Sequence, residues 1–326
     1  LQKMTSALKK IIDAKTLRSL VSSGAINKEG IRLFDCTFFP TQPPDYRLFR
    51  EESYGKFPDL VAAGSRAYTT YASSHIPGAV HCNPGIATFP SRFVRFNYYP
   101  ADIFEQYIQL LGVHKDEHII VYGRGPQGGM LFAGKIAWIL KSYGQDKLSL
   151  LDGGIEYWSK NKFELCNQPV QLPKGNWSAV DRISDFNITF DELEEKDADG
   201  KEFIEKIDQT RFLDARVRGQ FEGTEDSGLD PYVPATHIPG FTSMPSAELV
   251  NREGLLKSES EIKKGIPPGD SPIVTICNLG VQASLLSYVI QSIDSTTRPK
   301  VYPGSLKEME KRDPKKISAG KKNIIQ

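Results

Sequence analysis

The sequence carries one ordered set of landmarks twice, and this repeat limits the fold more than any other feature. In the first half, the landmarks are an apolar run at residues 31–35, a turn at 75–78, a second apolar run at 118–123 and a helical segment from 130. In the second half, the same order appears at residues 211–214, 237–240, 272–277 and 283–290. Short apolar runs alternating with helical segments predict parallel strands joined by helical crossovers. We therefore expect two α/β domains.

The connector between the two halves is expected at residues 166–185, which are rich in Pro, Gly, Asn and Ser and lack apolar periodicity. We place the boundary at Pro173, which gives domains of residues 1–172 and 173–326. Two domains agree with the length of 326 residues, since a domain has roughly 150 residues. The charged segment 191–208 has apolar residues spaced for one helical face and is predicted to be an exposed helix.

Composition excludes several classes of partner. The formal net charge is only +1, so no broad basic field is available to attract nucleic acid or anionic lipid. No apolar run reaches the roughly 18 residues that a membrane-spanning helix needs. We expect small molecules or proteins as partners; the sequence does not indicate an oligomeric state.

Four widely spaced cysteines resemble neither a disulfide framework nor a CxxC metal site, and they indicate a reducing compartment. Residues 3–18 are basic, with Leu and Ile at helical spacing, and are compatible with a mitochondrial presequence. The same positions suit the first helix of a folded domain, and Asp13 is unusual in a transit peptide. We favour the folded helix and a cytoplasmic protein, with the mitochondrion as the alternative.

Taken together, these landmarks resemble the rhodanese superfamily, and their tandem arrangement is similar to that of thiosulfate and 3-mercaptopyruvate sulfurtransferases. The resemblance spans nearly the whole chain and implies two tandem rhodanese-like domains, each with a parallel central sheet flanked by helices. The motifs that carry it are His-Ile-Pro-Gly turns from His75 and His237, Ser149 to Gly154 before Trp158, Asp214-Ala215-Arg216, Gly223-Thr224-Glu225, and Val301-Tyr302 before Gly304-Ser305.

Cys277 stands where this family has its catalytic cysteine, at the end of the central strand of the second domain. The equivalent position in the first half is Gly123, so the resemblance implies that the first domain lacks the nucleophile. Loop amides can converge on such a thiol, and a helix N-terminus adds about half a positive charge, so both favour the thiolate. A thiolate can take the outer sulfur of a thiosulfate-type or 3-mercaptopyruvate-type donor as a persulfide and pass it to cyanide or another thiol.

The residues expected to bind substrate depart from the family pattern. Arg-Lys or Gly-Ser usually follows the cysteine, whereas this chain has Asn278 and Leu279, and the usual Gly-Arg-Phe segment is Gly219-Gln220-Phe221. A second arginine, which the family usually has in a Glu-Pro-Arg segment, has no counterpart between Glu225 and His237. The candidate substrate contacts are the loop residues Asn278, Leu279, Gly280, Val281, Gln282 and Ala283, together with Gln220, Arg218 and His75.

Alternatives follow from the same residues. Cys277 can be a small buried residue that closes a strand, and His75 can serve only to organise its turn. A cysteine phosphatase needs an arginine after five intervening residues, and Ala283 stands there. No HExxH, Cys/His cluster or P-loop pattern indicates a metal or another cofactor. The rival to a sulfurtransferase is a catalytically degenerate rhodanese module for protein binding or sulfur sensing.

Overall fold

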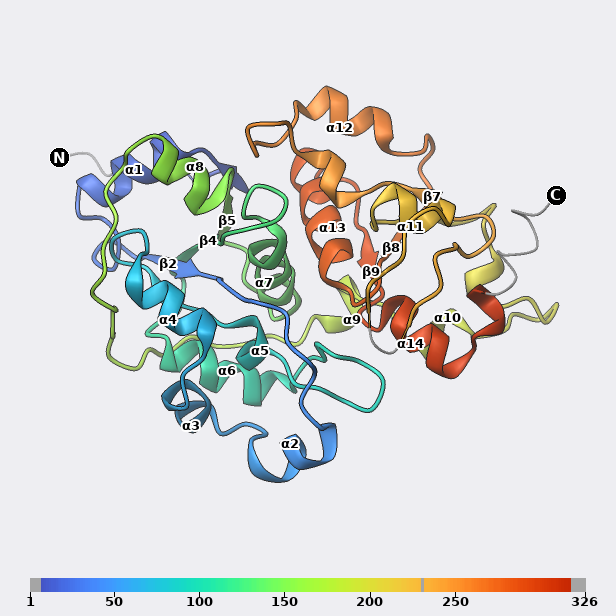
Figure 1. Ribbon diagram of the computed structural model, residues 1–326, viewed down its shortest axis with the longest axis horizontal. Helices are drawn as coiled ribbons and strands as arrows, with labels where there is room; N and C mark the ends of the chain where they lie inside the picture. Colours follow the sequence, from blue (N-terminus) through green and yellow to red (C-terminus); the bar gives the residue numbers. More distant parts are fainter. Residues whose placement is uncertain (1–6, 230–231, 318–326) are drawn as a thin grey trace.

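Two parallel β-sheets, each flanked by helices, form the framework of the computed structural model, which describes residues 7–229 and 232–317 (Figure 1). The first sheet has the order β1-β5-β4-β2-β3 and the second has the order β7-β6-β8-β9. The strands of the first sheet are β1 (Ile11–Ile12), β2 (Ile31–Asp35), β3 (Val80–His81), β4 (His118–Tyr122) and β5 (Leu148–Leu151). The strands of the second are β6 (Arg211–Asp214), β7 (Thr242–Ser243), β8 (Ile273–Ile276) and β9 (Lys300–Val301). The predicted α/β class is confirmed.

Corresponding strands of the two sheets have the same register. Asp35 at the end of β2 pairs with Tyr122 of β4, and Asp214 at the end of β6 pairs with Ile276 of β8. The next residue along each central strand is Gly123 in the first half and Cys277 in the second. These two positions are therefore structurally equivalent.

Helices cover both sheets and differ in length between the halves. The helices of the first half are α1 (Ala14–Ser22), α2 (Tyr46–Glu52), α3 (Phe57–Ala62), α4 (Arg66–Ser73), α5 (Pro84–Ala87), α6 (Ala101–Leu110), α7 (Leu131–Ser142) and α8 (Gly154–Lys160). Those of the second half are α9 (Ile183–Phe186), α10 (Phe190–Leu193), α11 (Arg218–Glu222), α12 (Glu259–Gly265), α13 (Val281–Ile293) and α14 (Ser305–Arg312), with 3-10 turns η1 (Phe203–Glu205) and η2 (Ser246–Leu249). Among the described residues, no helix is long and apolar enough to cross a membrane.

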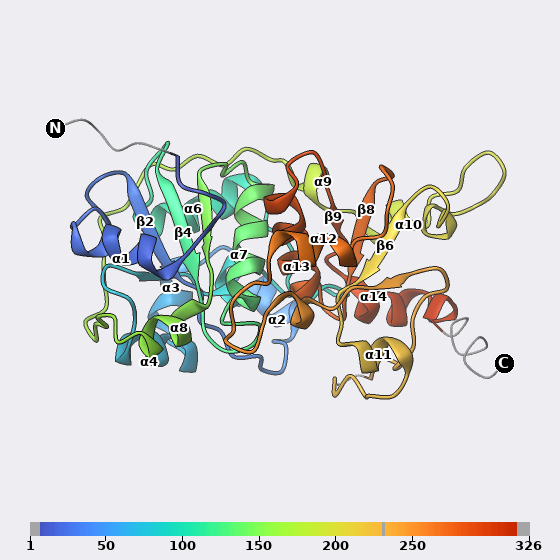
Figure 2. The same ribbon diagram turned by 90° about the horizontal axis from the view of Figure 1, so that it is seen from above.

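The two halves meet where α7 and α13 pack side by side between the sheets (Figure 2). The close approach depends on Gly134, because a Cβ atom there would lie only 2.9 Å from the Cα atom of Leu285. Buried residues of α7 and α13 belong to one continuous apolar cluster. This contact places the start of α7 beside the start of α13.

Two local predictions were wrong. Segment 191–208 is not one helix, because α10 ends at Leu193 and a bridge then joins Lys196 to Glu202. There the Asp197 side chain accepts hydrogen bonds from the amides of Asp199 and Lys201, a local arrangement that competes with helix formation.

The N-terminal helix also begins later than the apolar spacing suggested. Ile11 and Ile12 form an edge strand paired with Leu150 and Leu151, so they are not helical. Asp13 then caps α1 by accepting the amide of Thr16. Helix α1 is part of the folded core, since Leu17 is fully buried.

The segment from Cys166 to the start of α9 has no helix or strand of its own, in agreement with its turn-rich composition. It lies against the first half, where the amide of Gly175 donates to the carbonyl of Gln109 and the indole of Trp177 donates to Gln145. The boundary at Pro173 stays a prediction.

Candidate active site

Cys277 lies at the end of β8, in a tight loop that leads directly into α13. Its side chain is 1% exposed, and its sulfur accepts a hydrogen bond from the amide of Gly280 at 3.0 Å. Gly280 has φ +74°, and a Cβ atom there would lie 2.5 Å from the carbonyl oxygen of Pro303. Only glycine fits this turn, so the amide that faces the sulfur depends on Gly280.

The start of α14 fixes the loop from the other side. The Cys277 amide donates to Ser305 Oγ at 3.1 Å, and the Ser305 hydroxyl donates to the carbonyl of Tyr302 at 2.7 Å. The amides of Leu306 and Lys307 donate to the carbonyls of Cys277 and Asn278. The cysteine is thus held by its own backbone at both its N–H and its C=O.

The first turn of α13 supplies amides that the helix itself does not use. In an α-helix the first N–H groups have no intrahelical acceptor, and the aligned peptide dipoles give that end about half a positive charge. In this chain these groups belong to Val281, Gln282 and Ala283, directly after the cysteine loop. The site can therefore favour negative charge on the sulfur or on an anion bound beside it.

Asn278 and Gln220, two of the predicted substrate contacts, bind each other. Asn278 Nδ2 donates to Gln220 Oε1 at 3.0 Å, which joins the cysteine loop to α11. Asn278 Oδ1 is buried and has no hydrogen-bond partner among the described residues. The structure thus brings these two predicted contacts together beside Cys277 as a neutral pair.

The arginines near this pair have other partners. Arg216 is fully buried and binds Asp214 and the carbonyl of Thr236, which fits a structural role. Arg218 is half exposed and forms a two-point ion pair with Glu248, at 2.7 Å for its shorter contact. Its predicted contact with substrate stays a prediction.

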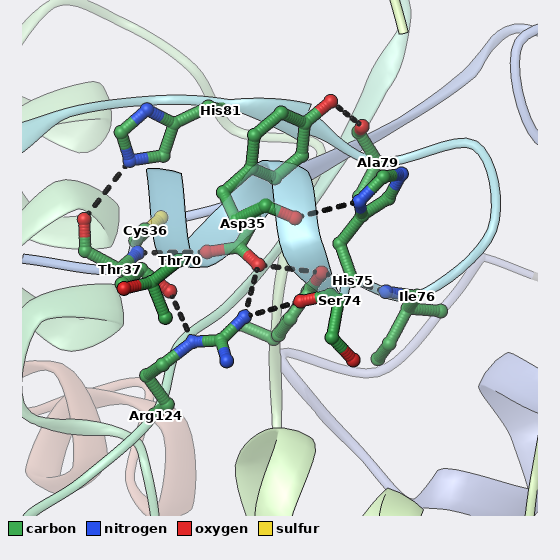
Figure 3. Close-up of polar contacts among 12 residues, drawn as sticks. Asp35, Cys36, Thr37, Thr70, Ser74, His75, Ile76, Ala79, His81 and Arg124 are labelled. Carbon is green, nitrogen blue, oxygen red and sulfur yellow. Dashed lines mark hydrogen bonds and ion pairs between the residues drawn. The ribbon is translucent and has the colours of Figure 1, made fainter. Parts of the chain in front are cut away.

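The equivalent loop of the first half is closed to a nucleophile. A Cβ atom at Gly123 would lie 2.8 Å from the carbonyl oxygen of Gly129, so no side chain fits there without a shift. Figure 3 shows the next residue, Arg124, folded back toward the end of β2, where it contacts Asp35 at 3.3 Å and Thr37 Oγ1 at 2.6 Å. Its guanidinium also donates to the carbonyl of Ser74 at 2.7 Å.

His75 lies in this first-half cluster, as Figure 3 also shows. The His75 ring is fully buried, its Nδ1 donates to the carbonyl of Tyr71 at 2.8 Å, and it stacks on the Tyr71 ring. Its backbone pairs with Cys166. None of the contacts described for His75 joins it to Cys277, so the proposed substrate contact stays untested.

Sequence reasoning missed a cationic cavity of about 420 Å³ next to the cysteine loop. Leu279 lines it, and so do Arg92 and Arg95 from the first half and Lys307 and Lys311 from α14. Among the described lining residues, Asp45 is the one acid, and its carboxylate accepts the amides of Arg47 and Leu48. These residues are about 200 positions apart, so no local motif could have revealed them.

The other three cysteines have no such surroundings. Cys36 and Cys82 are buried in the first-half core, where burial raises the pKa of the Cys36 thiol well above its usual value, and Cys166 is partly exposed on the connector. Among residues 7–229 and 232–317, no group of three or more His, Cys, Asp or Glu side chains is arranged to hold a metal ion.

Comparison with known proteins agrees with this geometry. Residues 25–161 match the family model described as "Rhodanese-like domain". The chain is 50% identical over 325 residues to the Caenorhabditis elegans protein named "Putative thiosulfate sulfurtransferase mpst-1", covering 98% of this chain and 99% of that protein. It is 29% identical over 239 residues to the 3-mercaptopyruvate sulfurtransferase of Rattus norvegicus, covering 69% and 73% of the two chains.

Solved structures show the same fold at low sequence identity. The crystal structure of SseA from Escherichia coli, described with the 3-mercaptopyruvate sulfotransferases, superposes with a TM-score of 0.68 at 24% identity and covers 91% of this chain and 99% of its own. The Tum1 protein of Saccharomyces cerevisiae superposes with a TM-score of 0.74 at 20% identity, covering 95% and 97%.

Proposed function

Because this chain belongs to the rhodanese family and is a sulfurtransferase, we propose that it moves sulfane sulfur from an anionic donor to a thiophilic acceptor as a persulfide on Cys277. The observation that carries the proposal is the position of the Cys277 sulfur, which accepts the Gly280 amide at 3.0 Å beside the N-terminus of α13. A thiolate there gains from both the hydrogen bond and the helix dipole.

The reaction balances in two half-steps. With thiosulfate, the Cys277 thiolate attacks the outer sulfur, a new S–S bond forms, and the bond to the sulfonate sulfur breaks to release sulfite with the electron pair. With 3-mercaptopyruvate, the thiolate attacks the sulfur, an S–S bond forms, and the carbon–sulfur bond breaks with its electron pair on the carbon, which takes the thiol proton and departs as pyruvate. In the second half-step, cyanide or an acceptor thiolate attacks the outer persulfide sulfur and Cys277 leaves as the thiolate.

Both donor types are anions, and the loop can hold an anionic group without the usual arginines. We assign this role to the backbone amides from Asn278 to Ala283, with Gln220, Arg218 and His75 as further candidate contacts. The cationic cavity beside Leu279 supplies the charge that the neutral Asn278–Gln220 pair lacks. Its cations would concentrate an anionic donor at the entrance to the cysteine loop.

Names of relatives favour an enzyme over the degenerate binding module, since curated proteins similar over most of this chain are sulfurtransferases. The direct test is intact-mass measurement after incubation with thiosulfate or 3-mercaptopyruvate, comparing wild type with C277S. We expect wild type to gain the mass of one sulfur and to lose it on addition of cyanide, and C277S to gain none.

The matched control is C166S, which removes the partly exposed cysteine and leaves the Cys277 loop intact. It should load sulfur as wild type does. Equal loading of C277S and wild type, or no loading of wild type by either donor, would refute the proposal.

A further inference from the structure

Lys135 is a buried cation for which the fold gives no structural reason. It lies in the second turn of α7, its side chain is 0% exposed, and its Nζ atom has no hydrogen-bond partner among the described residues. Burying an ammonium without an acceptor is more costly than burying an unpaired neutral polar group. A fold gains nothing from this arrangement unless the charge serves the site that it faces.

The surroundings of Lys135 direct it to the cysteine loop. Phe132 packs in one cluster with Val281 and Leu279, which lie on either side of Gly280 in the Cys277 loop. Lys135 follows Phe132 by three residues and therefore lies on the same face of α7. The contact of Gly134 with Leu285 brings this face close enough to α13 for the lysine to be enclosed.

Two groups interact with the ammonium. One is the ring of Tyr98, whose centroid lies 5.2 Å from Nζ, and the Tyr98 hydroxyl donates to Asn187. The charge that acts on Lys135 is that of Cys277, whose loop contributes Leu279 and Val281 to the cluster around Phe132. Burial lowers the pKa of Lys135 to about 8, and Cys277 opposes this by raising it. Burial raises the pKa of Tyr98, so the phenol stays neutral, and the charge that favours the ammonium is that of Cys277.

We propose that Lys135, contributed by the half that lacks a nucleophile, is the counter-cation of the Cys277 sulfur and stabilises both its thiolate and its persulfide. The coupling is reciprocal, because a thiolate that favours the ammonium is itself favoured by it to the same extent. Lys135 is thus a positioning residue that replaces, from across the interface, the cations absent at Asn278 and Leu279. The part that concerns the persulfide rests on the proposed function; the part that concerns the thiolate does not.

The test is a pH titration of the Cys277 thiolate by its ultraviolet absorbance, taken as the difference between each protein and its C277S derivative. We expect K135M to raise the midpoint by about one pH unit, since an opposite charge within a few ångströms shifts a pKa by about 1–3 units. K135R, which keeps the positive charge, should have a midpoint close to that of wild type. If K135M does not fold, K135Q also removes the charge but keeps a polar group at the end of the side chain, and it gives the same comparison.

Lys141 is the matched control on the same helix. Burial also lowers its pKa to about 8, but the charges that act on it are those of Lys10, Asp146 and Arg182. K141M should leave the Cys277 midpoint within about 0.3 units of wild type. A midpoint unchanged in folded K135M, or shifted equally by K141M, would overturn the inference.

Sulfur loading of wild type, measured in parallel by intact mass, separates this inference from the proposed function. If wild type gains sulfur but K135M leaves the Cys277 midpoint unchanged, the role of Lys135 is rejected and the proposed function stands. If K135M raises the Cys277 midpoint but wild type gains no sulfur, the pairing of Lys135 with the Cys277 thiolate is supported and the persulfide on Cys277 is rejected.

Discussion

Asn278 Nδ2 donates a hydrogen bond to Gln220 Oε1 at 3.0 Å, so the cysteine loop and helix α11 are joined by two neutral amides. The pair spans 58 positions of sequence and leaves Asn278 Oδ1 buried without a partner. A site that must bind an anion here depends on backbone amides and on charges supplied from further away. This dependence can be tested one contribution at a time.

Restoring a cation at position 220 should strengthen binding of thiosulfate. A charge-assisted hydrogen bond contributes about 1.5–3 kcal/mol, so Q220R should raise kcat/KM for thiosulfate by about tenfold or more. Steady-state kinetics with cyanide as acceptor measures the change. Q168R adds the same charge on the exposed connector and should have little effect; an equal gain in both variants would show that only net charge matters.

Replacing Gly280 by alanine should abolish loading of Cys277 and destabilise the fold. A left-handed backbone costs a non-glycine residue roughly 1–2 kcal/mol, and the new Cβ atom would lie 2.5 Å from the Pro303 carbonyl. The turn must shift, which withdraws the Gly280 amide from the sulfur. Denaturant unfolding and intact mass after thiosulfate measure the two effects.

Gly125 provides a close control for that experiment. It has φ +91° in the first-half loop, but a Cβ atom there meets nothing within 4 Å. G125A therefore has the backbone cost without the clash and should load sulfur normally. Loss of loading in G125A, or full loading in G280A, would contradict this account of the turn.

Removing charge from the cavity should weaken donor binding without slowing the chemical step. The double variant R92Q/K311Q deletes two cations that line the cavity, and neither replaces a residue of the cysteine loop. We expect KM for thiosulfate to rise several-fold, kcat to stay near wild type, and the salt dependence of kcat/KM to weaken. K263Q, at an exposed position of α12, is the control. A fall in kcat with KM unchanged would show that these cations act on the chemical step and not on donor binding.

The strands, the turns and the equivalence of Gly123 with Cys277 were readable from sequence because each is encoded locally. An apolar run followed by a glycine-rich turn predicts a strand that ends in a loop in either half. The repeat then shows which positions of the two halves correspond. Local pattern failed where tertiary contacts or local hydrogen bonds outweighed it. Ile11 and Ile12 pair with β5, and Asp197 accepts amides that a helix would have used.

The charges around the cysteine were not readable, because they come from the other half. Lys135 is separated from Cys277 by more than a hundred residues, and nothing in the α7 sequence distinguishes a lysine that points to solvent from one enclosed by α13. The crossing of α7 and α13 at Gly134 decides this. A glycine inside a helical pattern was the one visible hint of such a contact.

The depressed pKa of Lys135 should appear in the pH dependence of stability. The folded protein releases this proton at about pH 8, whereas an unfolded lysine keeps it to about pH 10.4. Between these values the unfolded chain binds more protons, so the free energy of unfolding rises with pH. Below pH 8 the full cost of the buried ammonium is present.

K135M should therefore be more stable than wild type at neutral pH and should lose this advantage as the pH rises from 8 toward 10.5. At 1.36 kcal/mol per pKa unit, burial of the lysine charge lowers the free energy of unfolding of wild type by up to about 3 kcal/mol. Denaturant unfolding of both proteins between pH 8 and pH 10.5 measures this difference. K160M, at an exposed position, should leave the slope unchanged. Parallel curves for K135M and wild type would mean that Lys135 keeps an ordinary pKa. A variant that gains stability while its Cys277 thiolate becomes harder to form would show that the fold retains this lysine for the cysteine.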